Sequence, residues 1–174
     1  MKGTTIVASQ TSKDRPLTDP DTTASADTDI EKIVSTWHYQ VTFSDCDPAA
    51  LAYYPRIIEW CDWANEHMWR SVGFAWHDFF GTEGMNGMPL LNVDISFHFP
   101  MRHGDRLTFK TWLDRIEGRT FTIGHEIYNG EHLSAKSEEK RAWVVLAPDR
   151  PKGLKAIPMP EEVVALFRRS KDGT

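Results

Sequence analysis

Apolar and polar residues alternate along several segments of the chain, which is the pattern of a β-strand with one buried face. These segments are residues 37–44, 91–99, 106–116, 119–129 and 141–147. Short turns separate the last four of them, including Asn129-Gly130, a dipeptide typical of hairpins. We therefore expect one strand first and, later in the chain, a four-stranded antiparallel meander.

One long helix is predicted between the first two strands, over residues 55–72. Five apolar residues recur there at helical spacing and share one stripe, namely Ile57, Trp60, Cys61, Ala64 and Met68. Further apolar residues flank the stripe, so other elements are expected to wrap this helix. A short amphipathic helix is predicted after Pro160. The predicted fold class is α+β, with an antiparallel sheet of about five strands wrapped around one long central helix.

The first 30 residues differ in composition from the rest of the 174-residue chain. They contain five aspartates, two prolines and no aromatic residue. Such a segment buries too little apolar surface to offset the entropy lost on ordering. The sequence therefore predicts a disordered N-terminal arm over residues 1–30 and a single domain over residues 31–174.

Charge and cysteine content exclude several classes of protein. The net charge is −5, from 20 basic and 25 acidic residues, which argues against a nucleic-acid partner. Cys46 and Cys61 are too few for a disulfide framework, and no metal-ligand spacing is present. No apolar run is long enough to span a membrane, and the N-terminus lacks a secretory leader. We expect a cytoplasmic protein without a metal ion or membrane association.

The densest chemical feature is the segment FSDCDPAALAYYP, residues 43–55, which joins the first strand to the predicted helix. Asp45 and Asp47 precede the free N–H groups of a helix start, and such donors suit a developing oxyanion. A second interpretation is structural, because aspartate is also a common turn and cap residue. Spacing alone favours the structural interpretation.

The same segment resembles the active-site signature of the 4-hydroxybenzoyl-CoA thioesterase family, which belongs to the hotdog-fold superfamily. That signature runs Asp-x-Asp-Pro-Ala-Gly, then a few apolar residues, then Tyr-Pro at the helix start. Three further segments look like that family, namely Gly87-Met88-Pro89, Gly104-Asp105 and Arg119-Thr120-Phe121. The resemblance covers residues 36–150.

The resemblance implies a hotdog fold and hydrolysis of an acyl-CoA thioester to a free acid and CoA. Asp47 would be the catalytic carboxylate, acting as a nucleophile or as a general base, and the backbone N–H of Tyr54 would polarise the carbonyl. Asp45 is assigned to structure. Ala50 stands where the signature usually has glycine, which restricts the backbone beside the reacting bond. No cofactor is implied, because CoA is part of the substrate.

The resemblance also implies a homodimer or homotetramer with active sites at the subunit interface. Arg115 and Arg119, together with Lys152 and Lys155, are candidates to bind CoA phosphates, because such cations suit phosphate. An ordinary solvated turn is the competing interpretation for these cations. Arg119 is the better candidate, because the family places a basic residue there.

The acyl pocket has aromatic candidates in Trp60 and Trp76, with Phe79 and Phe80 as further possibilities. Core packing is the competing interpretation of these side chains. The identity of the acyl group, aromatic or aliphatic, is not predicted. Two other functions stay open, namely a hotdog hydratase or dehydratase acting on 3-hydroxyacyl thioesters and a non-catalytic acyl-CoA binding protein.

Overall fold

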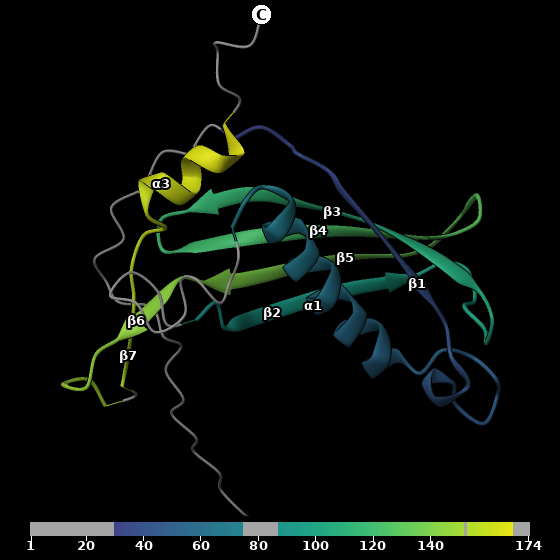
Figure 1. Cartoon of the computed structure of the whole chain (residues 1–174). Helices are drawn as coiled ribbons and strands as arrows, with labels where there is room; N and C mark the ends of the chain where they lie inside the picture. Colours follow the sequence, from purple (N-terminus) through teal and green to yellow (C-terminus); the bar gives the residue numbers. More distant parts are fainter. Residues whose placement is uncertain (1–29, 75–86, 152, 169–174) are drawn as a thin grey trace, which may run out of the picture.

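Five strands form one antiparallel sheet with the order β1-β3-β4-β5-β2 (Figure 1). The computed structural model describes residues 30–74, 87–151 and 153–168. The strands of the sheet are β1 (Ser35–Gln40), β2 (Leu90–Phe97), β3 (Arg106–Glu117), β4 (Thr120–Asn129) and β5 (His132–Ala142). Two short strands, β6 (Val144–Leu146) and β7 (Leu154–Ala156), pair separately with each other.

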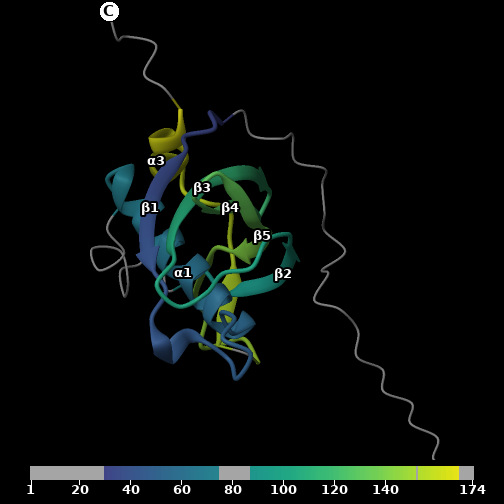
Figure 2. The same ribbon diagram turned by 90° about the vertical axis from the view of Figure 1, so that its right-hand side faces the viewer.

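The helix α1 (Tyr54–Ser71) crosses one face of this sheet, and the sheet curls around it (Figures 1 and 2). The predicted apolar stripe is buried in full, from Ile57 to Met68. Its N-terminal half packs with residues of β3 and β4, among them Phe109 and Ile127. The expected α+β architecture, with one long helix inside a five-stranded sheet, is confirmed.

The predicted four-stranded meander is wrong in its order and in its last strand. Only β3, β4 and β5 follow one another across the sheet, while β2 pairs with β5 at the far edge. The last strand of the sheet begins at His132, not near Arg141. Its buried face carries polar side chains, including Ser134, Ser137 and Glu139, so it shows no hydrophobic alternation.

The end of the sheet away from the start of α1 is closed by α3 (Glu161–Val164) and the following turn η2 (Ala165–Phe167) (Figure 1). Phe167 packs edge-on against Trp69 near the end of α1, with 5.2 Å between ring centroids. The helix predicted after Pro160 is thereby confirmed.

The predicted N-terminal arm lies outside the described residues except for Ile30, which packs against the core. Among the described residues, no helix combines the length and the apolar character needed to cross a membrane.

Candidate active site

The segment between β1 and α1 forms a closed loop that brings Asp45 next to the start of the helix. Cys46 and Ala52 form an isolated antiparallel bridge across this loop. Closer to the tip, the N–H of Asp47 donates to the carbonyl of Leu51 at 2.8 Å. The loop is therefore held at its base and near its tip by backbone hydrogen bonds.

Asp47 lies at the tip of this loop with its carboxylate half-buried. Its Oδ1 accepts hydrogen bonds from the backbone N–H groups of Ala49 at 2.8 Å and Leu51 at 3.1 Å. Its Oδ2 has no hydrogen-bond partner within the described part of the chain. The turn-forming role and a chemical role are thus compatible, because one oxygen holds the turn and the other is free to react.

The backbone N–H of Tyr54 is a free donor at the start of α1. The N–H before it, on Tyr53, donates to the carbonyl of Asp45 at 2.7 Å, and the residue after it, Pro55, has none. Arg56 donates back to the carbonyl of Tyr53 at 2.8 Å. The N–H of Tyr54 finds no acceptor among residues 30–74, 87–151 and 153–168, so it is available to a ligand at the positive end of the helix dipole.

Ala50 adopts a left-handed backbone conformation, with φ of +59°. It is the one non-glycine residue with positive φ in the described segments. Such a conformation costs a residue with a Cβ on the order of 1 kcal/mol. A glycine at this position would adopt the conformation freely, whereas alanine adopts it under strain.

An apolar groove of about 350 Å³ opens beside Tyr54. Tyr54 and Ile57 line it from α1, and Phe97, Phe99 and Met101 line it from the end of β2 and the segment that follows. Phe97 and Phe99 are 50% and 38% exposed. The sequence assigned both to the buried face of a strand, and only the three-dimensional arrangement places them at a groove.

The other predicted substrate-binding residues lie elsewhere. Trp60 is fully buried under the sheet, where it packs against Tyr39, so in this conformation it is part of the core. Arg119 is exposed and has no ion pair with any residue that the structure describes. Arg115 lies against three carboxylates, of which Asp114 is the nearest at 2.6 Å. Trp76 lies outside the described residues.

Arg119 also lies far from Asp47. Arg106, at the start of β3, pairs with Gln40 at the end of β1 and so lies near the loop of Asp47. Arg119 follows the other end of β3, which is 12 residues long. That length corresponds to roughly 35–40 Å along the strand. One chain therefore does not bring Asp47 and Arg119 to the same site.

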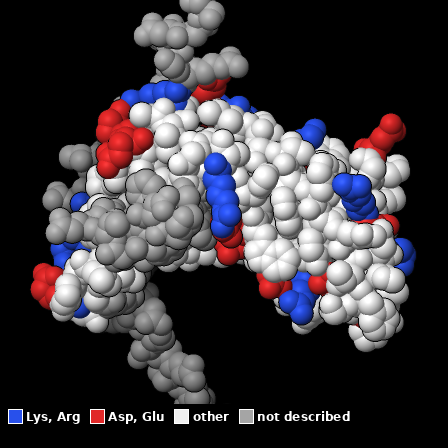
Figure 3. All heavy atoms as spheres, in the orientation of Figure 1, with Lys and Arg blue, Asp and Glu red and all other residues white. Residues whose placement is uncertain are grey.

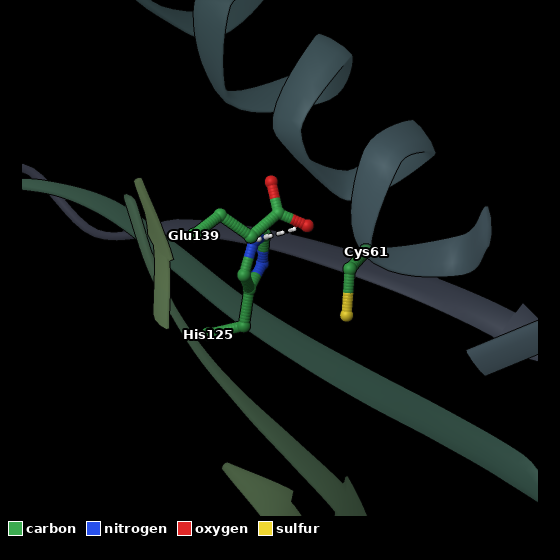
Figure 4. Close-up of side chains that lie close together, drawn as sticks. All are labelled: Cys61, His125 and Glu139. Atoms are coloured by element: carbon green, nitrogen blue, oxygen red, sulfur yellow. Dashed lines mark ion pairs between the residues drawn. The ribbon is translucent and has the colours of Figure 1, made fainter. Parts of the chain in front are cut away.

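Cys61, His125 and Glu139 form a buried polar cluster between α1 and the sheet (Figure 4). Their potential ligand atoms lie within 4.8 Å of one another, and zinc accepts this set of donors. However, Arg141 already pairs with Glu139 at 2.8 Å, and burial, reinforced by the charge of Glu139, raises the pKa of the Cys61 thiol. Glu139 therefore already has a cationic partner from the protein, and Cys61 is held as an inert thiol.

Comparison with known proteins identifies the type of fold and its relatives. The pattern of a family described as the thioesterase-like superfamily matches residues 41–167. A 4-hydroxybenzoyl-CoA thioesterase of Pseudomonas sp. is 25% identical over 137 residues, which are 75% of this chain and 95% of that protein. A 1,4-dihydroxy-2-naphthoyl-CoA hydrolase of Microcystis aeruginosa is 24% identical over 123 residues, 71% of this chain and 85% of that one.

Solved structures agree with this relationship. A mutant 4-hydroxybenzoyl-CoA thioesterase in complex with 4-hydroxybenzoyl-CoA superposes with a TM-score of 0.69 at 24% identity, over 77% of this chain and 98% of that one. A gentisyl-coenzyme A thioesterase superposes with a TM-score of 0.65, also at 24% identity, over 76% and 98%. These likenesses establish the hotdog fold that the sequence predicts.

Proposed function

Because the chain belongs to the thioesterase-like superfamily, we propose that it hydrolyses an acyl-CoA thioester to a free acid and CoA. The observation that carries this proposal is the pairing of a reactive group with an oxyanion donor. Asp47 and the free N–H of Tyr54 belong to one short loop and the helix that it starts, and Tyr54 lines an apolar groove. A carboxylate and a preorganised N–H are the two groups that acyl transfer from sulfur requires.

In the proposed reaction the thioester carbonyl oxygen accepts a hydrogen bond from the N–H of Tyr54. Asp47 then acts in one of two ways. As a nucleophile, its oxygen bonds to the acyl carbon and the C–S bond breaks, and water cleaves the resulting anhydride. As a general base, it takes a proton from water as the water attacks, and that proton passes to the leaving thiolate. Both routes consume one water and release one acid and one thiol.

The groove beside Tyr54 is proposed to take the acyl group. Its walls are apolar and partly aromatic, and an uncharged acyl group gains from leaving water there. The relatives named above act on aromatic acyl-CoA compounds, by their names. An aromatic acyl group is therefore the first class to test on this chain.

A homodimer or homotetramer with the site at the subunit interface completes the proposal. The face that carries α1 is sparsely charged (Figure 3), and β2 is an edge strand with exposed apolar side chains such as Leu91 and Phe97. Such edges are normally covered by a partner. Because Arg119 lies far from Asp47 in its own chain, its proposed role is to hold the CoA phosphates at the partner's site. The free Cys46 and Cys61 are in keeping with a cytoplasmic location.

The test measures free thiol released from a panel of aromatic and aliphatic acyl-CoAs. We expect turnover by the natural protein and a loss of about three powers of ten or more with Asp47→Asn. Asp149→Asn is the control, because Asp149 lies in the exposed turn between β6 and β7. CoA binding without thiol release would favour the acyl-CoA binding protein. Water addition to an unsaturated acyl-CoA without thiol release would favour the hydratase, with His98 at the groove as its candidate base.

A further inference from the structure

The carboxylate of Asp45 is buried at the base of the loop that carries Asp47, and its residue is only 5% exposed. Its Oδ2 accepts three hydrogen bonds. The donors are the hydroxyl of Tyr39 at 2.9 Å, the backbone N–H of Thr42 at 2.7 Å and the hydroxyl of Thr42 at 2.6 Å. Asp45 is thereby fixed to the end of β1 and to the turn η1 (Phe43–Asp45).

The main chain of Asp45 holds the other side of the loop. Its carbonyl accepts the N–H of Tyr53 at 2.7 Å, and its Oδ1 lies 4.0 Å from Nε of Arg56 in the first turn of α1. Because the N–H of Tyr53 is bonded in this way, the N–H of Tyr54 is the first unpaired donor at the helix start among the described residues. One residue therefore connects β1, the loop and the helix start.

We propose that Asp45 is a positioning residue for the hydrolysis proposed above, on which this inference rests. Its carboxylate locks the base of the loop and so sets the position of Asp47 relative to the N–H of Tyr54. Asp45 itself is not placed to touch substrate, because the residue is buried, its Oδ2 is occupied by Tyr39 and Thr42, and its Oδ1 faces Arg56.

The physical reason is that three donors converge on one oxygen. A negatively charged oxygen accepts such bonds more strongly than a neutral one. Removing the carboxylate leaves a buried N–H and two hydroxyls without an acceptor, so the end of β1 and the loop must rearrange to satisfy them. A displacement of about 1 Å at a reacting group can cost a factor of about 100 in rate.

The effect is expected mainly in kcat, because Phe97, Phe99 and Met101 line the groove from outside the loop that Asp45 holds. Leu51, Ala52 and Tyr54 line it from the loop and the helix start, so a small change in KM is also expected. With a substrate that the natural protein turns over, Asp45→Ala should lower kcat by roughly 100-fold and change KM by less than about threefold. Asp45→Asn keeps an acceptor oxygen of the same shape and should recover part of the loss. Tyr39→Phe removes one donor and should lower kcat by a few-fold.

The matched control is Tyr128→Phe. The hydroxyl of Tyr128 donates to Glu126 at 2.9 Å, the same tyrosine–carboxylate contact as that of Tyr39 and Asp45, but it lies on β4 and Tyr128 does not line the groove. Its removal should leave kcat unchanged. A purely structural role of Asp45 would lower the melting temperature but leave kcat per folded molecule unchanged, and that result would overturn the proposal. If Asp45→Ala does not fold, the kcat values of Asp45→Asn and Tyr39→Phe test the proposal in its place.

Amide hydrogen exchange gives a second measurement that needs no activity. Asp45→Ala should speed exchange at the bonded N–H groups of Ala49, Leu51 and Tyr53, while those of β3 and β4 keep their protection. A protein that hydrolyses no acyl-CoA but shows this change would refute the proposed function and keep the geometric role of Asp45. Unchanged exchange at these three amides would refute the positioning role, whether or not the protein is active.

Discussion

Arg141 on β5 donates a hydrogen bond to Asp62 on α1, with 2.6 Å between Nη2 and Oδ1. The same guanidinium holds the buried Glu139 and donates to the carbonyl of Met88, just before β2. Arg141 thus connects the helix, the sheet and the entry to its edge strand. Of its two carboxylate partners, Glu139 is buried and Asp62 is 51% exposed.

This difference predicts that replacing Arg141 lowers the free energy of unfolding by more than replacing Asp62 does. Arg141→Met leaves the Glu139 charge buried without its cation, and we expect a loss of about 3–5 kcal/mol in the free energy of unfolding. Asp62→Asn breaks a partly exposed pair and should cost less than about 1 kcal/mol. Urea unfolding of both variants measures the difference. Equal costs would show that Glu139 does not depend on Arg141.

The strain at Ala50 predicts a stabilising substitution. Ala50→Gly relieves the left-handed conformation, which costs about 1–2 kcal/mol, but gives the unfolded chain more freedom, which offsets about 0.4–1 kcal/mol. We expect a net gain of about 0.5–1 kcal/mol in the free energy of unfolding.

Gly130→Ala is the matched control for Ala50→Gly. Gly130 has φ of +60° in the β4–β5 turn, and a Cβ built there meets no atom within 4 Å, so only the backbone conformation resists alanine. This change should lower stability by about 1 kcal/mol. Equal stability of Ala50→Gly and the natural protein would mean that the loop carries no strain at residue 50.

The loop that carries the candidate site is local in sequence, because its aspartates and the helix start lie within 11 residues of one another. Their spacing alone favoured a turn and cap role, and the catalytic role of Asp47 was implied by the family resemblance and stays a prediction. The groove was not predictable, because it depends on β2 leaving Phe97 and Phe99 uncovered at the sheet edge. The distance of Arg119 from Asp47 follows from strand pairing, which no local pattern contains.

The strand β5 was not predicted in its true position, for a different reason. Its buried positions hold Ser134, Ser137, Glu139 and Arg141, so they do not form an apolar face, and Arg141 donates a hydrogen bond to Glu139. Binary patterning identifies strands only where burial is hydrophobic. A strand that buries charges in pairs looks like a surface segment, as the run from Lys136 to Arg141 does.

The surroundings of Asp45 predict how stability depends on pH. Burial raises the pKa of the Asp45 carboxyl, but the hydrogen bonds from Thr42 and Tyr39 and the charge of Arg56 outweigh it, so its pKa lies below the ordinary value. An unfolded aspartate has a pKa of about 3.9, so the folded state gains from the charged form above that pH. The gain is lost as the pH falls through the lower pKa of the folded state.

Asp45→Asn should therefore be less stable than the natural protein at pH 7, and the difference should shrink as the solution is acidified below about pH 4. Glu139 also has a lowered pKa, because His125 and Arg141 outweigh its burial, so the variant keeps some acid sensitivity. Urea unfolding at several pH values between 7 and 3 measures the difference. A gap that stays constant down to pH 3 would contradict the assignment of a charged Asp45.

The separation of Asp47 and Arg119 along β3 predicts complementation between two variants that are each impaired, Asp47→Asn and Arg119→Ala. Consider a heterodimer in which one chain carries Asp47→Asn and the other carries Arg119→Ala. One of its sites combines the intact Asp47 of the second chain with the intact Arg119 of the first. If each site takes its phosphate-binding arginine from the partner, this heterodimer should recover about half of the activity of the natural dimer per dimer. The two variants are co-expressed with different tags, and the mixed species is purified through both tags before thiol release is measured.

The control heterodimer pairs the double variant Asp47→Asn/Arg119→Ala with a natural chain. Each of its sites then lacks one of the two residues, so its activity should stay near that of the single variants. The opposite ranking, with the double-variant heterodimer at half activity and the mixed single variants inactive, would place Arg119 in the same chain's site. Equal recovery in both heterodimers would mean that Arg119 plays no part in binding CoA, because only Asp47 would then matter.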